Sequence, residues 1–327
     1  MRILITGSSG HLGEALARTL RNTNHEVIGI DLIPSRFTNV VGSIIDRDFV
    51  MRCMKDVQVV MHTATLHKPH LFTHTAQNFI DTNITGTLNL LEQATQTNVH
   101  SFIFTSTTSA FGYAHTPTNN SPAVWVTEDL RPIPKNIYGV TKSAAEDLCE
   151  LFNRNHGLPC IVLRTSRFFP EEDDREEIRR DYEDANVKAN EFLYRRVDVE
   201  DVVNAHLLAM QKAKEIGFNR YIVSATSPFT EQDLHDLRTN APAVVKKLFP
   251  DFEQIYADRG WRMFPDIDRV YVNQRARQDL GWNPKYDFRK ILDELKLGND
   301  PRSLLAGEIG SKGYHSMRIE QTPYPSK

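Results

Sequence analysis

Residues 1–31 read MRILITGSSGHLGEALARTLRNTNHEVIGID, and this stretch decides the fold. An apolar run at 2–6 leads into a turn with three glycines. An amphipathic stretch then leads to a second apolar run at 26–30 and to an acid. This order predicts a strand, a phosphate-binding turn, a helix and a second strand, the first unit of a dinucleotide-binding α/β fold.

The three glycines of the turn have separate tasks. Gly7 lets the chain turn tightly off the strand, Gly10 lets the backbone approach a pyrophosphate, and Gly13 lets the helix lie close to the sheet. The helix N-terminus offers unpaired N–H groups and a partial positive charge to the phosphates. Asp31 lies where a carboxylate can take both hydroxyls of an adenosine ribose, and its charge opposes a 2′-phosphate. The predicted cofactor is therefore NAD rather than NADP.

The composition narrows the class of protein. The 327 residues include 40% hydrophobic and 25% charged residues, with a formal net charge of -3, so nothing indicates binding to nucleic acid or to an anionic membrane. The three cysteines (Cys53, Cys149 and Cys160) have no metal-like spacing and fit a reducing compartment. A core strand at residue 2 leaves no room for a signal peptide, and no apolar run reaches transmembrane length. We expect a cytoplasmic protein.

Apolar runs and helical patterns alternate through the first half of the chain. The predicted strands are 3–6, 27–30, 57–61, 101–106 and 160–163, and 218–223 predicts one more. The predicted helices are 11–21, 46–54, 73–97 and 136–155. Such alternation is typical of a doubly wound, Rossmann-type parallel sheet with helices on both faces.

A change of texture after residue 165 predicts a second lobe. We expect an NAD-binding domain at 1–165, to which 216–224 returns, and a smaller, interleaved C-terminal substrate lobe at 166–215 and 225–297. The segment 298–327 has weak periodicity and is expected to form a C-terminal tail that wraps the surface or contacts another subunit. The long helices 73–97 and 136–155 are the expected interface of a homodimer.

Tyr138 and Lys142 lie four residues apart in YGVTK, so both side chains project from one helix face. A nearby ammonium favours phenolate and lowers the pKa of a tyrosine, which can then act as a base. About thirty residues earlier, FIFTSTTSAFG (102–112) predicts a strand that runs into a hydroxyl-rich turn. A hydroxyl there can hold a substrate oxygen beside the phenol. Asn83 lies within a predicted helix whose β-branched residues and Gly86 are poor helix formers.

With these segments in order, residues 1–297 resemble the extended short-chain dehydrogenase/reductase family, which contains nucleotide-sugar epimerases and dehydratases. The glycine turn, HTAT at 62–65 and LGWNP at 280–284 match its pattern. The resemblance implies a catalytic set of Thr107, Tyr138 and Lys142. It also implies a set of cofactor-binding residues: Gly7, Ser9, Gly10, His11, Leu12, Gly13, Asp31, Ser43, Ile44, Thr63, Ala64, Asn83, Tyr138 and Lys142.

Two departures from the family concern the substrate. Ser166 and Arg167 stand where the family often has an asparagine that binds a nucleotide-sugar pyrophosphate, and Asp198 stands for a histidine at a second place expected near the sugar. Ser166 and Arg175 also resemble the serine and arginine that hold a sugar acid in uronate dehydrogenases of this family. We therefore expect an anionic substrate held by arginine. The implied substrate-binding residues are Thr107, Thr108, Ser166, Arg167, Arg175 and Arg196.

These observations predict an NAD-dependent oxidoreductase acting on a sugar hydroxyl, most similar to a nucleotide-sugar epimerase. Two alternatives stay open: a dehydrogenase of a free sugar or sugar acid, and a regulatory NAD-binding protein without turnover. His67, His70 and His74 could suggest a metal, but Pro69 disrupts their helical spacing and no carboxylate accompanies them, so no metal site is predicted.

Overall fold

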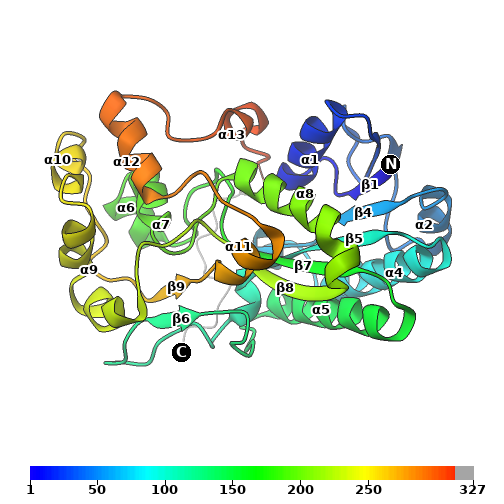
Figure 1. The fold of residues 1–327 in the computed structure, drawn as a ribbon, viewed down its shortest axis with the longest axis horizontal. Helices are drawn as coiled ribbons and strands as arrows, with labels where there is room; N and C mark the ends of the chain where they lie inside the picture. The colour runs from blue at the N-terminus through cyan, green and yellow to red at the C-terminus, as the bar shows by residue number, and fades with distance from the viewer. Residues whose placement is uncertain (314–327) are drawn as a thin grey trace.

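The central feature is a seven-stranded parallel sheet, seen in a computed structural model that describes residues 1–313 (Figure 1). Its strand order is β3-β2-β1-β4-β5-β7-β8. The strands are β1 Arg2–Thr6, β2 Glu26–Asp31, β3 Val40–Val41, β4 Val59–His62, β5 Ser101–Thr107, β7 Cys160–Thr165 and β8 Phe218–Val223. The chain therefore has the predicted doubly wound, Rossmann-type fold, and this order brings the carboxyl ends of β1, β4 and β5 to one edge.

Both faces of the sheet are covered, as the alternation of its buried side chains shows. Ile3 and Ile5 pack on one face with α1 (His11–Arg21) and α8 (Val199–Ile216). Leu4 packs on the other face with α2 (Arg47–Cys53), α4 (Gly86–Gln96) and α5 (Ile137–His156). Burial on both sides explains why the strands are short apolar runs rather than alternating ones.

The predicted helix 73–97 is present as a helix that contains a π-helical turn. A 3₁₀ turn η1 (Lys68–Phe72) precedes α3 (Ala76–Ile80), and a π-helical turn η2 (Asp81–Thr85) separates α3 from α4. Thr87, in the first turn of α4, donates a hydrogen bond from Oγ1 to the carbonyl of Asn83 in the π-helical turn at 2.7 Å. Side-chain bonds of this kind compete with the regular helix ladder, and π-turns are frequent at functional sites. The segment is therefore helical as predicted, with a π-helical turn at its centre.

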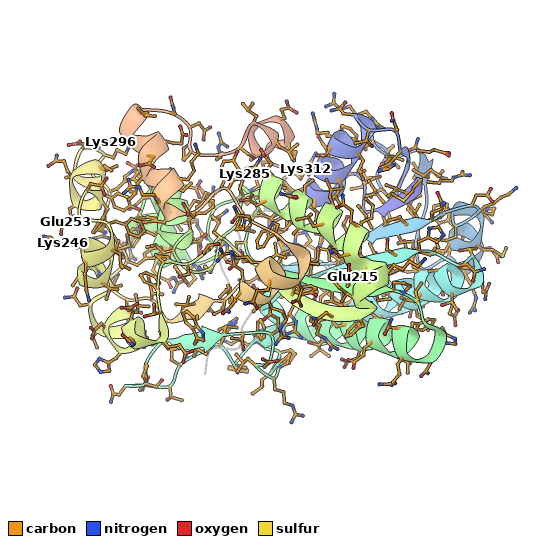
Figure 2. The ribbon with its side chains drawn as sticks, viewed as in Figure 1. Glu215, Lys246, Glu253, Lys285, Lys296 and Lys312 are labelled. Carbon is orange, nitrogen blue, oxygen red and sulfur yellow. The ribbon has the colours of Figure 1, made fainter. Side chains whose placement is uncertain are left out.

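A second core lies beside the sheet, at the left of Figure 1. It is formed by helices and by the short parallel pair β6 (Val124–Val126) and β9 (Arg269–Tyr271). The helices at this end are α6 Glu176–Asp181, α7 Asp184–Glu191, α9 Leu234–Leu248, α10 Phe252–Ala257 and α12 Phe288–Leu297. A surface ion pair between Lys246 and Glu253 joins α9 to α10 (Figure 2).

The structure corrects part of the expected lobe boundary. Helix α8, and α11 (Gln274–Leu280) with Trp282, pack on the sheet core rather than on the second core. The physical reason for α8 is that a helix connecting two parallel strands must return across their sheet. Strand β6 lies within the expected NAD-binding domain yet pairs with β9. The division into two lobes otherwise stays a prediction.

The chain end described by the structure packs against the first helix. In α13 (Leu304–Ile309), Ile309 is buried in the sheet core with residues of α1 and α8. Beyond it, Lys312 forms an ion pair with Glu14 of α1 (Figure 2). The first part of the predicted tail thus wraps the surface, and 314–327 lies outside the described residues. No helix within the described range is both long and apolar enough to cross a membrane.

Candidate active site

A cavity of about 1280 Å³ runs from the glycine turn past the end of β5 to the second core. A pocket for one drug-sized ligand usually measures roughly 300–1,000 Å³. This cavity can therefore hold a dinucleotide and a second molecule. The predicted cofactor residues that line it are Gly7, Ser9, Gly10, His11, Leu12, Gly13, Asp31, Ser43, Ile44, Thr63, Ala64 and Tyr138.

Within the glycine turn, Gly7 and Gly13 have no space for a side chain. Gly7 has φ +72°, and a Cβ atom on Gly13 would lie 2.0 Å from the Gly7 carbonyl oxygen. Asp31 holds the turn from the next strand, because its carboxylate accepts hydrogen bonds from Ser9 N and Ile33 N, both at 2.9 Å. The turn thus presents backbone N–H groups at a helix N-terminus beside a fixed carboxylate, an arrangement that fits NAD.

His11 links this turn to the loop after β7. Its Nε2 lies 3.2 Å from Glu171 Oε1, and its ring meets that of Phe169 edge to face. Burial alone would raise the pKa of Glu171, but the hydrogen bond and charge of His11 lower it to about 2. The glycine turn and the loop after β7 are therefore joined by the buried contact between His11 and Glu171.

Thr107 and Tyr138 meet at the wall of the cavity. Thr107 ends β5, and Tyr138 lies in the first turn of α5, which Asn136 caps by accepting a hydrogen bond from Gly139 N at 3.0 Å. Thr107 is close enough to Tyr138 to act on the phenol as a hydrogen-bond partner. Burial raises the pKa of Tyr138 to about 12, and the bond to Thr107 acts in the opposite direction. The predicted lowering of this pKa is not observed.

Lys142 lies one turn further along α5 and is directed to the sheet. Its Nζ donates a hydrogen bond to the Thr105 carbonyl at 2.7 Å and lies 3.9 Å from the centre of the Phe104 ring. Burial lowers the pKa of Lys142 to about 7, and the charge of Glu146 opposes this. Its contact with the cofactor stays a prediction.

The side chain of Asn83 is fully engaged within the protein. Its Oδ1 accepts from Leu66 N and Thr65 Oγ1, and its Nδ2 donates to Leu66 O and Thr141 Oγ1, all at 2.9–3.0 Å. The prediction that Asn83 contacts the cofactor directly is therefore wrong. Asn83 instead fixes the loop after β4, which lines the cavity, to the helix that carries Tyr138.

A buried carboxylate lies behind the reactive end of β5. Ser106 Oγ donates to Glu146 Oε1 at 2.5 Å, and Arg164 Nη2 donates to Glu146 Oε2 at 2.7 Å. Arg220 of β8 adds a contact at 3.2 Å. Tyr138, Lys142 and Glu146 follow one another at four-residue intervals, so one face of α5 carries all three.

At the end of the cavity near the second core, Thr108, Ser166, Arg167 and Arg175 line the wall, and their contact with a substrate stays a prediction. Ser166 is 4% exposed, and its hydroxyl has no hydrogen-bond partner within residues 1–313. Arg167 pairs with Asp173 at 2.5 Å and with Glu191 at 3.2 Å. Arg175 is more than half exposed and lies 3.8 Å from Asp173.

Two predicted substrate positions are wrong. Arg196 is 5% exposed and donates to Glu191 Oε2 at 2.8 Å and to the Phe169 carbonyl at 3.0 Å, so it stabilises the loop behind the cavity. Asp198 accepts from Glu200 N at 2.8 Å as the N-cap of α8 and from Ser303 N at 3.1 Å. Neither forms part of the cavity wall within the described range.

The three histidines lie together on the rim of the cavity without a metal-like arrangement. His67 stacks on Phe169, and His70 lies edge to face with both His67 and His74. No cluster of three or more His, Cys, Asp or Glu suited to a metal occurs within residues 1–313.

A family model described as "NAD dependent epimerase/dehydratase family" matches residues 3–223. The chain belongs to this family. Its cofactor is accordingly NAD, in keeping with the turn and Asp31.

Curated members of the family resemble the chain at low identity. It is 24% identical over 316 residues to a "Putative UDP-glucose 4-epimerase" of Methanocaldococcus jannaschii, covering 88% of this chain and 95% of that protein. It is 28% identical to the "Uncharacterized UDP-glucose epimerase YtcB" of Bacillus subtilis and 25% identical to a "Uronate dehydrogenase" of Pseudomonas syringae. These two matches cover 50% and 53% of this chain, and 55% and 62% of the relatives' lengths.

Solved structures of the family share the fold. A UDP-glucose 4-epimerase of Thermotoga maritima with UDP-glucose superposes with a TM-score of 0.62 at 25% identity, covering 91% of this chain and 97% of that one. A short-chain dehydrogenase/reductase superfamily protein of Agrobacterium tumefaciens with bound NAD gives 0.65 at 22% identity, covering 94% and 99%.

Several residues of this family member's cavity were not among the predicted site residues. They are Lys135, His115, Tyr194, Arg195, Arg238 and Arg269. They come from five separate segments, so no local spacing connects them in the sequence. The apolar residues that flank Arg195 and Arg196 make both arginines candidates for an anion site, and in the structure Arg195, not Arg196, lines the cavity.

Proposed function

We propose that this chain oxidises a hydroxyl of a nucleotide sugar and reduces the resulting ketone on its other face, as a nucleotide-sugar epimerase does. The observation that carries the proposal is that Thr107 and Tyr138 lie together in the wall of the same cavity as the glycine turn. A phenol held there is within reach of a sugar hydroxyl placed beside a bound dinucleotide.

The side chains have complementary roles. Thr107 holds the substrate oxygen, and Tyr138 Oη takes the hydroxyl proton during oxidation and returns it during reduction. In its protonated form, Lys142 favours the phenolate through its positive charge. Bound NAD supplies the acceptor and then the donor of the hydride.

Two observations support a nucleotide sugar. The cavity exceeds the usual size for a single ligand, and the similarity to the M. jannaschii putative epimerase extends over nearly the whole of both chains. We also propose that the protein is a homodimer through 73–97 and 136–155, which light scattering would test, and that it acts in the cytoplasm.

A second candidate is an NAD-dependent dehydrogenase of a sugar acid. It is favoured by the unpartnered hydroxyl of Ser166 and by Arg175 in the cavity wall, and a uronate dehydrogenase is among the relatives. In this case NADH leaves as a product. The third candidate, a regulatory NAD-binding protein, has less support because both Tyr138 and Lys142 are retained.

One panel of substrates separates the three candidates. The purified protein is incubated with NAD and with nucleotide sugars, free aldoses or uronates, and both NADH and the sugar products are measured. An epimer without net NADH supports the proposal, whereas stoichiometric NADH with a uronate supports the dehydrogenase. Binding of NAD with no product from any substrate would refute both enzymes. Tyr138→Phe is the matched control for turnover.

A further inference from the structure

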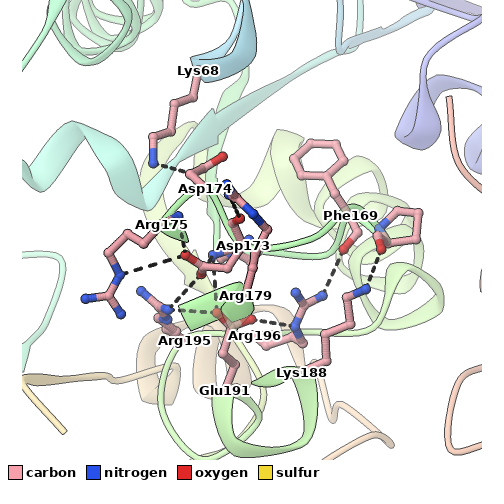
Figure 3. A network of polar contacts seen from close by, with 12 residues as sticks. Lys68, Phe169, Asp173, Asp174, Arg175, Arg179, Lys188, Glu191, Arg195 and Arg196 are labelled. Carbon is pink, nitrogen blue, oxygen red and sulfur yellow. Dashed lines mark hydrogen bonds and ion pairs between the residues drawn. The ribbon is translucent and has the colours of Figure 1, made fainter. Parts of the chain in front are cut away.

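Two arginines and two carboxylates contact one another at the substrate end of the cavity. Figure 3 labels three of these residues, Asp173, Glu191 and Arg195. Arg167 Nη1 lies 2.5 Å from Asp173 Oδ2 and 3.2 Å from Glu191 Oε1. Arg195 Nη2 contacts the same two oxygens at 3.4 Å and 2.8 Å. Two guanidinium groups thus share two carboxylates, and one atom of each arginine contacts both acids.

The two carboxylates differ in position. Glu191 is fully buried, lies behind the cavity wall and also holds Arg196 at 2.8 Å, so it is a permanent counterion. Asp173 lines the cavity, on the loop between β7 and α6. Glu191 offers one negative charge to three arginines, which leaves two positive charges for Asp173 to face. Burial alone would raise the pKa of Asp173, but Arg167 and Arg195 lower it well below its usual range.

We propose that Asp173 is an internal placeholder for the anionic group of the substrate, a phosphate or a carboxylate that takes its place between Arg167 and Arg195. The inference rests on the proposed function, because it concerns the same cavity. Asp173 thereby sets specificity: a neutral sugar cannot compete for the two guanidinium groups, whereas an oxyanion can make two parallel hydrogen bonds to them.

The surroundings allow this exchange. Arg175, which is more than half exposed, lies 3.8 Å from Asp173 Oδ1 and provides a second cation for the displaced carboxylate. The hydroxyl of Ser166, buried and without a partner within residues 1–313, is next to Arg167 in the chain and faces the same cavity. It supplies a further donor for the incoming oxyanion.

The test measures anion binding rather than turnover. Inorganic pyrophosphate and glucuronate are titrated by calorimetry into the wild-type protein and Asp173→Asn at constant ionic strength. We expect Asp173→Asn to bind one of the two probes at least ~10-fold more tightly, about 1.4 kcal/mol. Tighter binding of pyrophosphate would indicate a substrate with a phosphate group, and tighter binding of glucuronate would indicate a sugar acid. Adding Arg195→Gln to Asp173→Asn should abolish the gain.

Asp174→Asn is the matched control. It removes the same charge from the same loop, and Asp174 forms an ion pair with Lys68, so the affinities of this variant for the two probes should change less than about threefold. Equal affinities of wild type and Asp173→Asn for both probes would overturn the proposal. If Asp173→Asn is unfolded in buffer, recovery of its circular dichroism upon addition of either probe supports the proposal, and no recovery contradicts it.

These outcomes are independent of the proposed function. A protein that binds pyrophosphate through Arg195 but epimerises no sugar would refute the epimerase and leave the role of Asp173 intact. An active epimerase whose KM for its sugar substrate is the same in the wild-type protein and in Asp173→Asn would support the proposed function and refute the role of Asp173.

Discussion

Arg164 and Glu146 form a buried ion pair in which Nη2 lies 2.7 Å from Oε2, and both side chains are at most 3% exposed. The pair connects β7 to α5, and through Ser106 it also holds β5 next to Thr107. The residues that carry the chemistry are thus positioned by a charge cluster that does not itself line the cavity.

Removal of this carboxylate should strongly destabilise the fold. Glu146→Ala leaves Arg164 buried without its counterion, so the free energy of unfolding in urea should fall by about 3–5 kcal/mol. Asp147→Ala, at an exposed neighbour that pairs with Arg220, should change it by less than about 1 kcal/mol. Similar losses in both variants would contradict the structural role of the pair.

Tyr138→Phe should lose turnover by at least ~100-fold, because the proton acceptor is removed. The ring remains in its buried site, so the affinity for NAD should stay within about threefold of wild type. Initial rates with the best substrate of the panel and a fluorescence titration with NAD would check this. Near-normal rates would show that another group moves the proton.

Lys142 should make stability depend on pH in a defined window. Its pKa falls from 10.5 in the unfolded chain to about 7 in the fold because of burial. Between these values the unfolded chain binds more protons, so the contribution to stability rises with pH from about 7 to about 10.5 and is lost as the pH falls to 7. Lys142→Met should lack this rise, which is on the order of a few kcal/mol. The free energy of unfolding of both proteins is measured in urea at each pH. Parallel curves of this free energy against pH would refute the role of Lys142.

Asp31 should decide between the two dinucleotides. Its carboxylate is held beside the turn by Ser9 N and Ile33 N, so a 2′-phosphate would meet a fixed negative charge. Asp31→Asn keeps an acceptor for these N–H groups but removes the charge. The preference for NAD over NADP should drop by about tenfold, measured as a ratio of dissociation constants. An unchanged ratio would show that another residue makes the distinction.

The sequence was sufficient for the fold, because the fold depends on local patterns. The order of strand, glycine turn and helix is contiguous, and Thr107 and Tyr138 each lie at an element end that periodicity can locate. Thr107 and Tyr138 were accordingly predicted as neighbours, and the structure brings them into contact.

The substrate end could not be predicted in the same way. Arg195 and Arg196 lie in an irregular segment, where no helical or strand periodicity fixes the direction of a side chain. The sequence therefore does not tell which of the two arginines faces the cavity. Asn83 was expected at the cofactor because a family pattern gives a residue's identity but not its partners. Asp198 could not be recognised as a helix cap with a second partner in Ser303, which is more than a hundred positions away.

The contacts made by the described end of the chain also bear on how the protein matures. Lys312 pairs with Glu14, Glu308 pairs with Arg18, and Ser311 donates to Glu171, which in turn pairs with His11. Lys312 and Glu14 are 298 positions apart in the sequence, and Arg18 and Glu308 are 290 positions apart. Contacts over such separations form late, since the intervening chain must be ordered first. The nucleotide-binding turn therefore reaches its final packing only once synthesis has passed residue 312.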